Sequence, residues 1–212
     1  MLDIITIPVT PFEQNARIVA CSVTKQAVVV DPGGEPDVIR AALVKSGYSC
    51  VGIWLTHSHL DHCGGVKPLL DYFHVPLVAH PIEEVLRSRV DQIAGMYGLP
   101  AGEFLNCPEP TEAIRGGESL PLGKHVAEVL FVPGHSPGHV AFYFRASATI
   151  LSGDCLFQGS IGRTDLPGGN HNQLITSIKE SILSLPDDTR VLSGHGADTS
   201  VGVERRTNPF LT

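Results

Sequence analysis

Several features that would place this chain in a familiar class are missing from its sequence. Only 15 of its 212 residues are Lys or Arg, against 22 Asp or Glu, and the formal net charge is −7. A nucleic-acid backbone demands clustered Lys and Arg, so this composition argues against general nucleic-acid binding. No apolar run approaches the roughly 20 residues that cross a bilayer, and the N-terminus lacks a basic leader segment. We therefore expect a soluble, cytoplasmic protein that binds neither nucleic acid nor membrane.

The cysteines also lack the spacing typical of disulfide frameworks and zinc sites. The chain has five cysteines, an odd number, and no CxxC pair. This excludes a disulfide framework or a cysteine-rich zinc site and favours a reducing compartment. Cys63 and Cys155 flank histidine and aspartate motifs and are expected to act as small hydrophobes. With 42% hydrophobic residues, the chain suits a single domain over 1–212.

Histidine, by contrast, is concentrated in one short stretch. Residues 56–62 read Thr-His-Ser-His-Leu-Asp-His, which puts three imidazoles and one carboxylate within six residues. An apolar run over 51–55 precedes the stretch and predicts a buried strand. Helical spacing of Val66, Leu69 and Phe73 follows it. The cluster is therefore expected on a strand-to-helix loop, where α/β folds place their sites.

Coordination explains this spacing. Neutral imidazole and carboxylate are ligands that zinc and its transition-metal neighbours accept. His57 and His59 alternate as on a strand end, so both can face one ion. Asp61 and His62 come after the chain turns and can face a second ion. A solvated, histidine-rich surface loop is the alternative, but such a loop would not need apolar flanks on both sides.

Three later segments repeat the same logic. Each has one His or Asp beside glycine, just past an apolar strand: His135 in 134–139, Asp154 in 152–155 and His195 in 193–196. Glycine lets the backbone turn sharply and approach closely there. A lone example would more often be a capping or turn residue. Together with the first loop, the segments supply a set of seven candidate ligands: His57, His59, Asp61, His62, His135, Asp154 and His195.

The remaining pattern predicts two groups of strands separated by helices. Strands are expected over 2–9, 16–24, 27–31, 51–55, 75–79, 118–122, 125–132, 140–145, 148–152 and 190–192. Helices are expected before Gly47, after Gly65, over 172–185 and from Pro81, the last with Ile82, Val85, Leu86, Ile93 and Tyr97 on its apolar face. Residues 98–117 are expected to be an irregular connection, and a short basic tail to close the chain. This order favours two sheets packed face to face with helices outside.

Taken in order, the four motifs resemble those of the metallo-β-lactamase fold superfamily over nearly the whole chain. The resemblance implies an α/β fold, an αββα sandwich of two mixed β-sheets with helices on the outer faces. It implies that His57, His59 and His135 hold a first metal ion, and that Asp61, His62 and His195 hold a second. Asp154 would bridge both ions, since a carboxylate offers two oxygens. The catalytic residues implied are Asp61, His62 and Asp154.

Three further segments resemble type II glyoxalases, the hydroxyacylglutathione hydrolases: 162–165, 170–174 and 204–210. This resemblance implies hydrolysis of S-lactoylglutathione to lactate and glutathione, a step of methylglyoxal detoxification. Typical members have a C-terminal helical domain that contacts glutathione, and this chain ends soon after His195. Candidate substrate contacts are therefore Arg163, His171 and Arg205. A solvated loop arginine is the alternative for Arg163, and a structural role is expected for His139.

The cofactor expected is a pair of divalent metal ions. Zinc is the default for these ligands, although iron and manganese occupy similar sites. Two ions about 3.5–4 Å apart can share a water molecule and lower its pKa towards neutrality, so that the resulting hydroxide attacks a thioester carbonyl. The thiolate that leaves is a weak base and needs little acid catalysis. We expect a monomer or a small homo-oligomer.

Other functions stay open at this point. An iron-dependent persulfide dioxygenase would use only two histidines and one aspartate, whereas all seven ligands are present here. A β-lactamase or another metallo-hydrolase acting on an ester or thioester is compatible with the same motifs, but dinuclear lactamases place a cysteine where Asp154 stands. A nuclease is disfavoured by the acidic charge. A non-catalytic module would be expected to have lost ligands.

Overall fold

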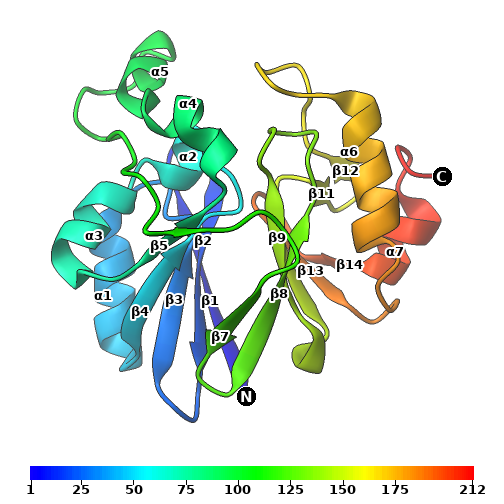
Figure 1. Cartoon of the computed structure of the whole chain (residues 1–212), viewed down its shortest axis with the longest axis horizontal. Helices are drawn as coiled ribbons and strands as arrows, with labels where there is room; N and C mark the ends of the chain where they lie inside the picture. Colours follow the sequence, from blue (N-terminus) through cyan, green and yellow to red (C-terminus); the bar gives the residue numbers. More distant parts are fainter. The chain divides into compact units, whose positions relative to one another are not determined.

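The computed structural model describes all residues, 1–212, and divides into two compact units. One unit comprises Met1–Ile114 and Pro121–His125, and the other comprises Arg115–Leu120 and Val126–Thr212. The first unit contains a six-stranded mixed sheet with helices beside it, and the second contains nearly all of another (Figure 1). Two mixed sheets with helices confirm the predicted α/β class.

The sheet of the first unit has the strand order β1-β2-β3-β4-β5-β6. Strands β1 to β3 pair antiparallel, and β3 to β6 run parallel. The strands are β1 (Leu2–Val9), β2 (Gln14–Cys21), β3 (Gln26–Val30), β4 (Ser49–Trp54), β5 (Leu77–Ala79) and β6 (Glu112–Ala113). The predicted strands are confirmed apart from their ends. For example, β2 stops at Cys21 because a turn with Lys25 at a φ of 60° leads into β3.

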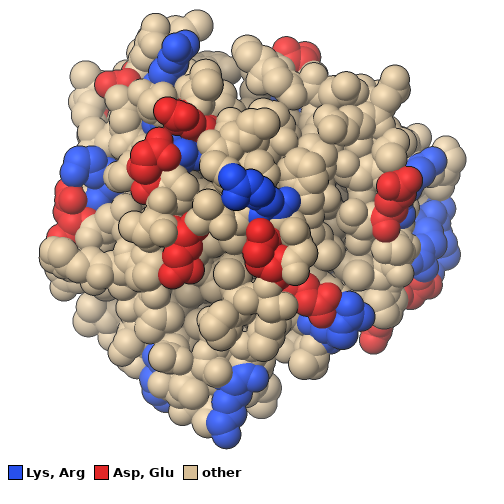
Figure 2. Space-filling view, in the orientation of Figure 1, with Lys and Arg blue, Asp and Glu red and all other residues tan.

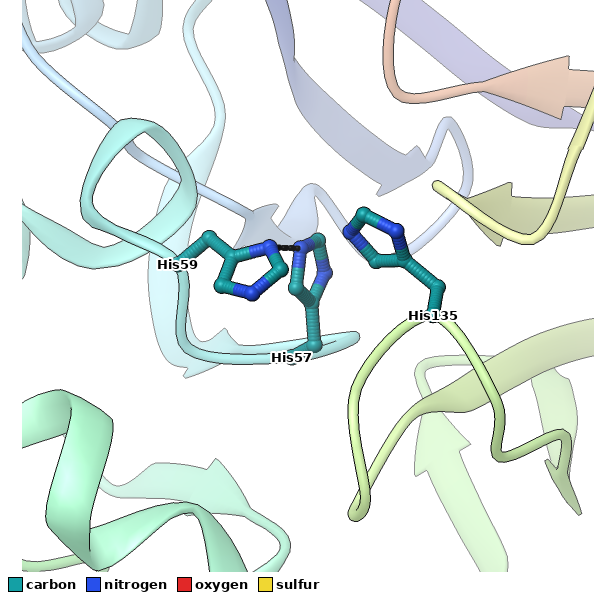
Figure 3. A group of neighbouring side chains, drawn as sticks. All are labelled: His57, His59 and His135. Atoms are coloured by element: carbon teal, nitrogen blue, oxygen red, sulfur yellow. Dashed lines mark hydrogen bonds between the residues drawn. The ribbon is translucent and has the colours of Figure 1, made fainter. Parts of the chain in front are cut away.

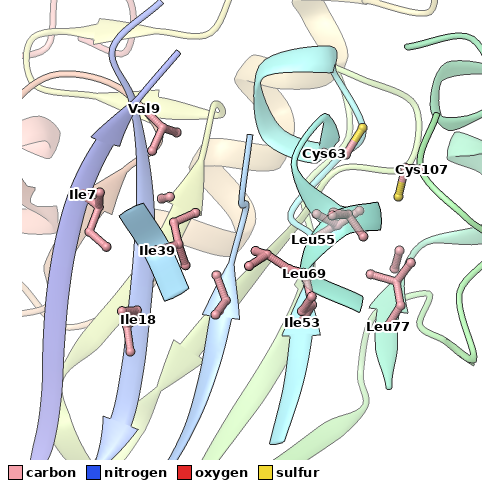
Figure 4. Packing of buried hydrophobic residues seen from close by; sticks show 14 of the residues in the cluster. Ile7, Val9, Ile18, Ile39, Ile53, Leu55, Cys63, Leu69, Leu77 and Cys107 are labelled. Carbon is pink, nitrogen blue, oxygen red and sulfur yellow. The ribbon is translucent and has the colours of Figure 1, made fainter. Parts of the chain in front are cut away.

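The helices of this unit pack an apolar core onto the sheet. The first three are α1 (Pro36–Ser46), α2 (Leu60–Cys63) and α3 (Val66–Phe73). Helix α1 ends as predicted at Gly47, whose φ of 70° suits glycine. Ile39 of α1 and Leu69 of α3 lie in one buried cluster with Ile18 and Ile53 of the strands (Figure 4). The parallel strands β3 and β4 are therefore held with their carboxyl ends at one edge.

The helix expected from Pro81 has a different buried face from the one predicted. It consists of three short pieces, η1 (Pro81–Glu83), α4 (Glu84–Arg87) and α5 (Val90–Met96). Ile82 and Val85 are 56% and 61% exposed, while Glu83 and Arg87 are 1% exposed. The prediction is wrong for Ile82, Val85 and Tyr97, which are exposed, whereas Leu86 is half-buried and Ile93 packs against the apolar core. Hydrogen-bond partners draw the charged residues inward instead. The Arg87 guanidinium donates to the His80 carbonyl and to Glu109, each at 3.0 Å.

The second sheet has the strand order β14-β13-β10-β9-β8-β7. Its strands are β7 (Ser119–Leu122), β8 (His125–Phe131), β9 (Val140–Phe144), β10 (Thr149–Gly153), β13 (Arg190–Ser193) and β14 (Thr199–Ser200). Strands β10 and β13 are parallel, and a separate pair is formed by β11 (Leu156–Phe157) and β12 (Ser160–Ile161). The strands predicted over 118–152 and 190–192 are confirmed.

Helices cover this sheet through a second apolar cluster. Helix α6 (His171–Ser177) continues into a π-helical turn (Ile178–Ile182), and α7 (Val201–Thr207) follows β14. Leu174, Ile178 and Ile182 are fully buried in one cluster with Tyr143 and Val191 of the strands. This confirms the inward face predicted for the helix over 172–185. No helix in the structure is both long and apolar enough to span a bilayer.

The predicted basic tail is a folded helix instead, α7, which encloses a buried carboxylate. Glu204 is fully buried and accepts hydrogen bonds from the Gly159 amide at 2.9 Å, the Thr199 hydroxyl at 2.6 Å and the Asn208 amide group at 2.8 Å. The sequence pattern missed this helix because its exposed arginines resemble a solvated tail.

We predict that Glu204→Ala lowers the free energy of unfolding by about 2–4 kcal/mol, because buried donors lose their acceptor and each unsatisfied group costs about 1–3 kcal/mol. Urea denaturation of both proteins measures the difference. Glu180→Ala, on an exposed part of the π-helical turn, is the matched control and should shift stability by less than about 0.5 kcal/mol. Equal midpoints for the Glu204 variant and wild type would contradict the prediction.

Candidate metal centre

The metal loop, defined as residues 56–62, begins just after β4 ends. It is held by a carboxylate that follows the neighbouring strand, β3. Asp31 follows β3 and accepts hydrogen bonds from the Thr56 amide at 2.7 Å and the Thr56 hydroxyl at 2.6 Å. Its φ is 51°, a left-handed conformation that Asp tolerates better than most residues. The parallel pairing of β3 and β4 brings the two strand ends together. These hydrogen bonds fix the backbone at the start of the loop independently of the ligand side chains.

His57 and His59 present nitrogens to the same point. His57 Nε2 lies 3.1 Å from His59 Nδ1, and the two rings meet edge to face at 86° (Figure 3). Two nitrogens bound to one tetrahedral zinc at 2.0–2.1 Å would lie about 3.3 Å apart. Thr56 Oγ lies 3.1 Å from His57 Nδ1, and since that hydroxyl donates to Asp31, the ring donates to it. This leaves Nε2 of His57 as the ligand atom.

His62 is oriented by the same aspartate. It is fully buried, and its Nδ1 lies 3.0 Å from Asp31 Oδ2 and 3.4 Å from the Gln14 amide group. A carboxylate beside Nδ1 favours the tautomer that carries its proton there and leaves Nε2 for a metal. Asp61 lies on α2 next to His62 and is partly exposed. The residue pattern predicted Asp31 only as the end of a strand, although its place just past an apolar strand and before two glycines resembles that of the candidate ligands.

In the second unit, the predicted ligands His135 and His195 both lie close to the third predicted ligand, Asp154. The Asp154 Oδ2 atom lies 3.7 Å from His135 Nε2 and 3.4 Å from His195 Nε2. Asp154 follows β10, while His135 and His195 follow β8 and β13, all strands of one sheet. One carboxylate oxygen of Asp154 thus lies near both imidazoles, which is compatible with the bridging role predicted for this residue.

Backbone groups orient these ligands. The Nδ1–H of His135 donates to the Arg163 carbonyl at 2.8 Å, which leaves Nε2 for a metal. The Asp154 amide donates to His139 Nε2 at 3.1 Å, so the structure places His139 behind the ligand. A Cβ on Gly162 would lie 1.9 Å from the Asp154 carbonyl oxygen. Gly162 is therefore needed for the 162–165 segment to approach the ligands.

The predicted substrate contacts occupy three different settings. Arg163 forms a bidentate ion pair with Asp165, with both contacts at 2.8 Å. The adjacent guanidinium lowers the pKa of Asp165 to about 2. His171 is the exposed first residue of α6. Arg205 donates to Asp187 and to the carbonyls of Leu183 and Leu185. The backbone carbonyl of Arg163 accepts a hydrogen bond from the candidate ligand His135. Arg205 links α7 to the segment before β13. A substrate role stays a prediction for all three.

The cysteines beside the ligands are inert by burial. Cys63 and Cys155 are both fully buried, and burial raises the pKa of each thiol well above its usual range. Neutral buried thiols pack as small hydrophobes, as the sequence analysis expected.

The chain belongs to the metallo-beta-lactamase superfamily, whose family model matches residues 9–195. Among curated relatives, the "Probable metallo-hydrolase YqgX" of Bacillus subtilis is 39% identical over 96% of this chain and 95% of its own length. The "Hydroxyacylglutathione hydrolase GloC" of Haemophilus influenzae is 37% identical over 99% of this chain and 98% of its own length.

Solved structures agree on the fold. The B3 metallo-beta-lactamase BLEG-1 superposes with a TM-score of 0.91 at 38% identity and covers 99% of this chain and 100% of its own. TTHA1623 in a di-iron-bound form has a TM-score of 0.89 at 40% identity and covers 98% of this chain and 100% of its own. The protein is a metallo-hydrolase of this fold. Its histidine and aspartate clusters fit a two-metal site, and the identity of the metal is open.

We predict that wild-type protein carries two metal ions per chain and that Asp154→Ala loses occupancy of both, since one carboxylate serves both ions. Elemental analysis of desalted protein gives the ratio of metal to chain. Asp188→Ala, which changes an exposed aspartate, is the matched control and should keep two ions. Two ions retained by the Asp154 variant would show that this residue does not bridge them.

A second prediction concerns Asp31. Asp31→Ala should weaken metal affinity about 10–100-fold, the usual cost of removing the partner that orients a histidine ligand. Competition with a chromogenic chelator measures this affinity, and Asp71→Ala, an exposed partner of Lys67, serves as the control. An unchanged affinity would mean that the loop orients His57 and His62 without this carboxylate.

Proposed function

We propose that the protein hydrolyses glutathione thioesters, with S-lactoylglutathione as the representative substrate. The observation that carries the proposal is the complete donor set, in which imidazole ligand atoms are selected by hydrogen bonds at the opposite ring nitrogens. The choice of substrate is supported by the relative named as a hydroxyacylglutathione hydrolase, which matches this chain along 99% of its length. The segment at 162–165, which resembles type II glyoxalases as well as sulfur-oxidising relatives, also contacts His135 directly.

In this proposal His57, His59 and His135 would hold one ion, Asp61, His62 and His195 would hold the other, and Asp154 would contact both. Two such ions, when bound, lower the pKa of a shared water and polarise a carbonyl. The protein contributes the orientation of each ligand. Asp31 keeps a proton on His62 Nδ1, and the Arg163 carbonyl keeps one on His135 Nδ1. In the neutral form of each ring, this hydrogen bond selects the tautomer that leaves Nε2 available.

A thioester suits this set of residues. Its leaving thiolate has a conjugate acid with a pKa near 8.5, so it departs without a proton from the protein. An amide nitrogen would need such a proton in the transition state. In the proposed reaction the side chains therefore need only to bind the metal ions and the substrate, and none has to act as a proton donor.

β-Lactam hydrolysis is a second candidate, because BLEG-1 is named as a B3 metallo-beta-lactamase and is 38% identical over nearly the whole chain. A lactam is an amide, so the argument about the leaving group places it behind the thioester. Comparing the two substrates on one enzyme preparation separates the candidates.

We expect metal-loaded protein to release thiol from S-lactoylglutathione, with no uptake of oxygen when glutathione persulfide is supplied. A thiol reagent follows the first reaction, an oxygen electrode the second, and a chromogenic cephalosporin tests lactam cleavage. The Asp154→Ala variant is the control for contaminating hydrolases. Oxygen uptake without thioester cleavage would replace the proposal with a persulfide dioxygenase, and faster lactam cleavage would replace it with a lactamase.

Substrate binding depends on local cations. Glutathione carries two carboxylates and one ammonium, and the protein is itself acidic at −7. On the face drawn in Figure 2, Lys and Arg are interspersed with Asp and Glu and form no extended basic patch. Arg163 is 57% exposed at its side chain and pairs with Asp165, which is 67% exposed. A substrate carboxylate could therefore compete with Asp165 for the guanidinium.

We predict that Arg163→Ala raises KM for S-lactoylglutathione about threefold to tenfold with kcat nearly unchanged, since an exposed ion pair contributes little more than about 1 kcal/mol. Steady-state kinetics measure both constants. Arg145→Ala, which removes an exposed guanidinium paired with Glu128, should leave both unchanged. An unchanged KM would assign Arg163 to a solvated loop.

A further inference from the structure

Ser58 stands between the ligands His57 and His59, and both of its backbone groups are engaged. Its amide donates to Glu83 Oε2 at 2.9 Å. Its carbonyl accepts the Cys63 thiol at 3.4 Å. All of these residues belong to the first unit. The peptide that separates two candidate metal ligands is thus held from both sides.

Glu83 is an unusual partner for this role because it is a buried carboxylate on a helical segment. It is 1% exposed and ends η1, directly before α4. The start of η1 is capped by His80, whose Nδ1 accepts the Ile82 amide at 3.2 Å. Arg87 lies one turn further along, also 1% exposed, and supplies a buried positive charge on the same side. The carboxylate is therefore presented by a fixed helical segment.

The direction of the Ser58 amide matters for coordination. A peptide unit is planar, so the direction of this N–H sets ψ of His57 and φ of Ser58 together. Together with the remaining backbone and side-chain torsions of residues 57–59, those two angles set the distance between His57 Nε2 and His59 Nδ1, which is 3.1 Å in this structure. Asp31 acts elsewhere, on the Thr56 amide and on the His62 ring. The two buried carboxylates thus support different parts of the metal loop.

We propose that Glu83 is a positioning residue that sets the affinity of the ion held by His57 and His59, through the Ser58 amide. The role requires an acceptor oxygen at the reach of a glutamate side chain and does not require its charge. The inference rests on the two-ion site of the proposed function and is independent of the substrate.

Titration of metal-free protein with cobalt(II), followed by visible absorption, tests the role. Wild type should take up two equivalents. Glu83→Asp keeps the charge but withdraws the carboxylate by one methylene, so one equivalent should bind about 10–100-fold more weakly, with altered absorption bands. Glu83→Gln keeps an acceptor oxygen at full reach and should bind both equivalents within about threefold of wild type. Glu84→Ala, the exposed neighbour, should match wild type.

The outcomes separate the possibilities. Two equivalents bound by Glu83→Asp at wild-type affinity would overturn the proposal, and so would a loss in Glu83→Gln equal to that in Glu83→Asp. Urea denaturation of the metal-free variants accompanies the titration. A variant that does not fold would assign Glu83 to the fold alone and would also overturn the positioning role. If wild type itself bound fewer than two equivalents, the failure would lie with the proposed site.

Discussion

The start of the metal loop and the orientation of two of its histidines depend on one buried carboxylate. Asp31 accepts the amide and the hydroxyl of Thr56 and contacts His62 Nδ1. Through the Thr56 hydroxyl it also orients His57. A buried carboxylate without such partners would be costly. One partner here, the Thr56 hydroxyl, contacts the candidate ligand His57, and another, His62, is itself a candidate ligand. The same bonds therefore satisfy the charge and align the rings.

The turn that carries Asp31 packs against the loop closely enough to demand glycine. A Cβ on Gly33 would lie 1.4 Å from the Asp61 carbonyl oxygen, and the Gly65 amide donates to the Pro32 carbonyl at 2.9 Å. A left-handed Asp31 costs some conformational energy, which the three hydrogen bonds offset. The backbone of β3 and that of the metal loop thus form one rigid support.

The second unit uses the same principle with different groups. His135 is oriented by a backbone carbonyl, and Asp154 is oriented through its amide by His139. In both units, ligands come from the ends of strands in one sheet, so the sheet sets their spacing. Membership of the superfamily explains this scaffold and the donor set. The exposed side chain of Arg163 is not part of this scaffold, and its role in substrate binding stays a prediction.

Much of this could be predicted from residue patterns alone. The strand expected over 2–9 and the helix expected before Gly47 are confirmed as β1 and α1. These two predictions succeeded because each depends on neighbours within a few residues. The histidine-rich stretch at 57–62 and three later segments with His or Asp beside glycine supplied the seven candidate ligands. The partners of the ligands were not predictable in this way, since Asp31 lies 31 residues from His62.

The buried charges show the same limit most clearly. Residue periodicity predicted that Ile82 and Val85 face inward, yet Glu83 and Arg87 are buried instead, and Glu204 is buried in a segment that resembled a tail. Periodicity reports only the preference of apolar groups for burial. A charged group is buried when distant parts of the chain supply its hydrogen bonds, and only the tertiary structure brings those partners together.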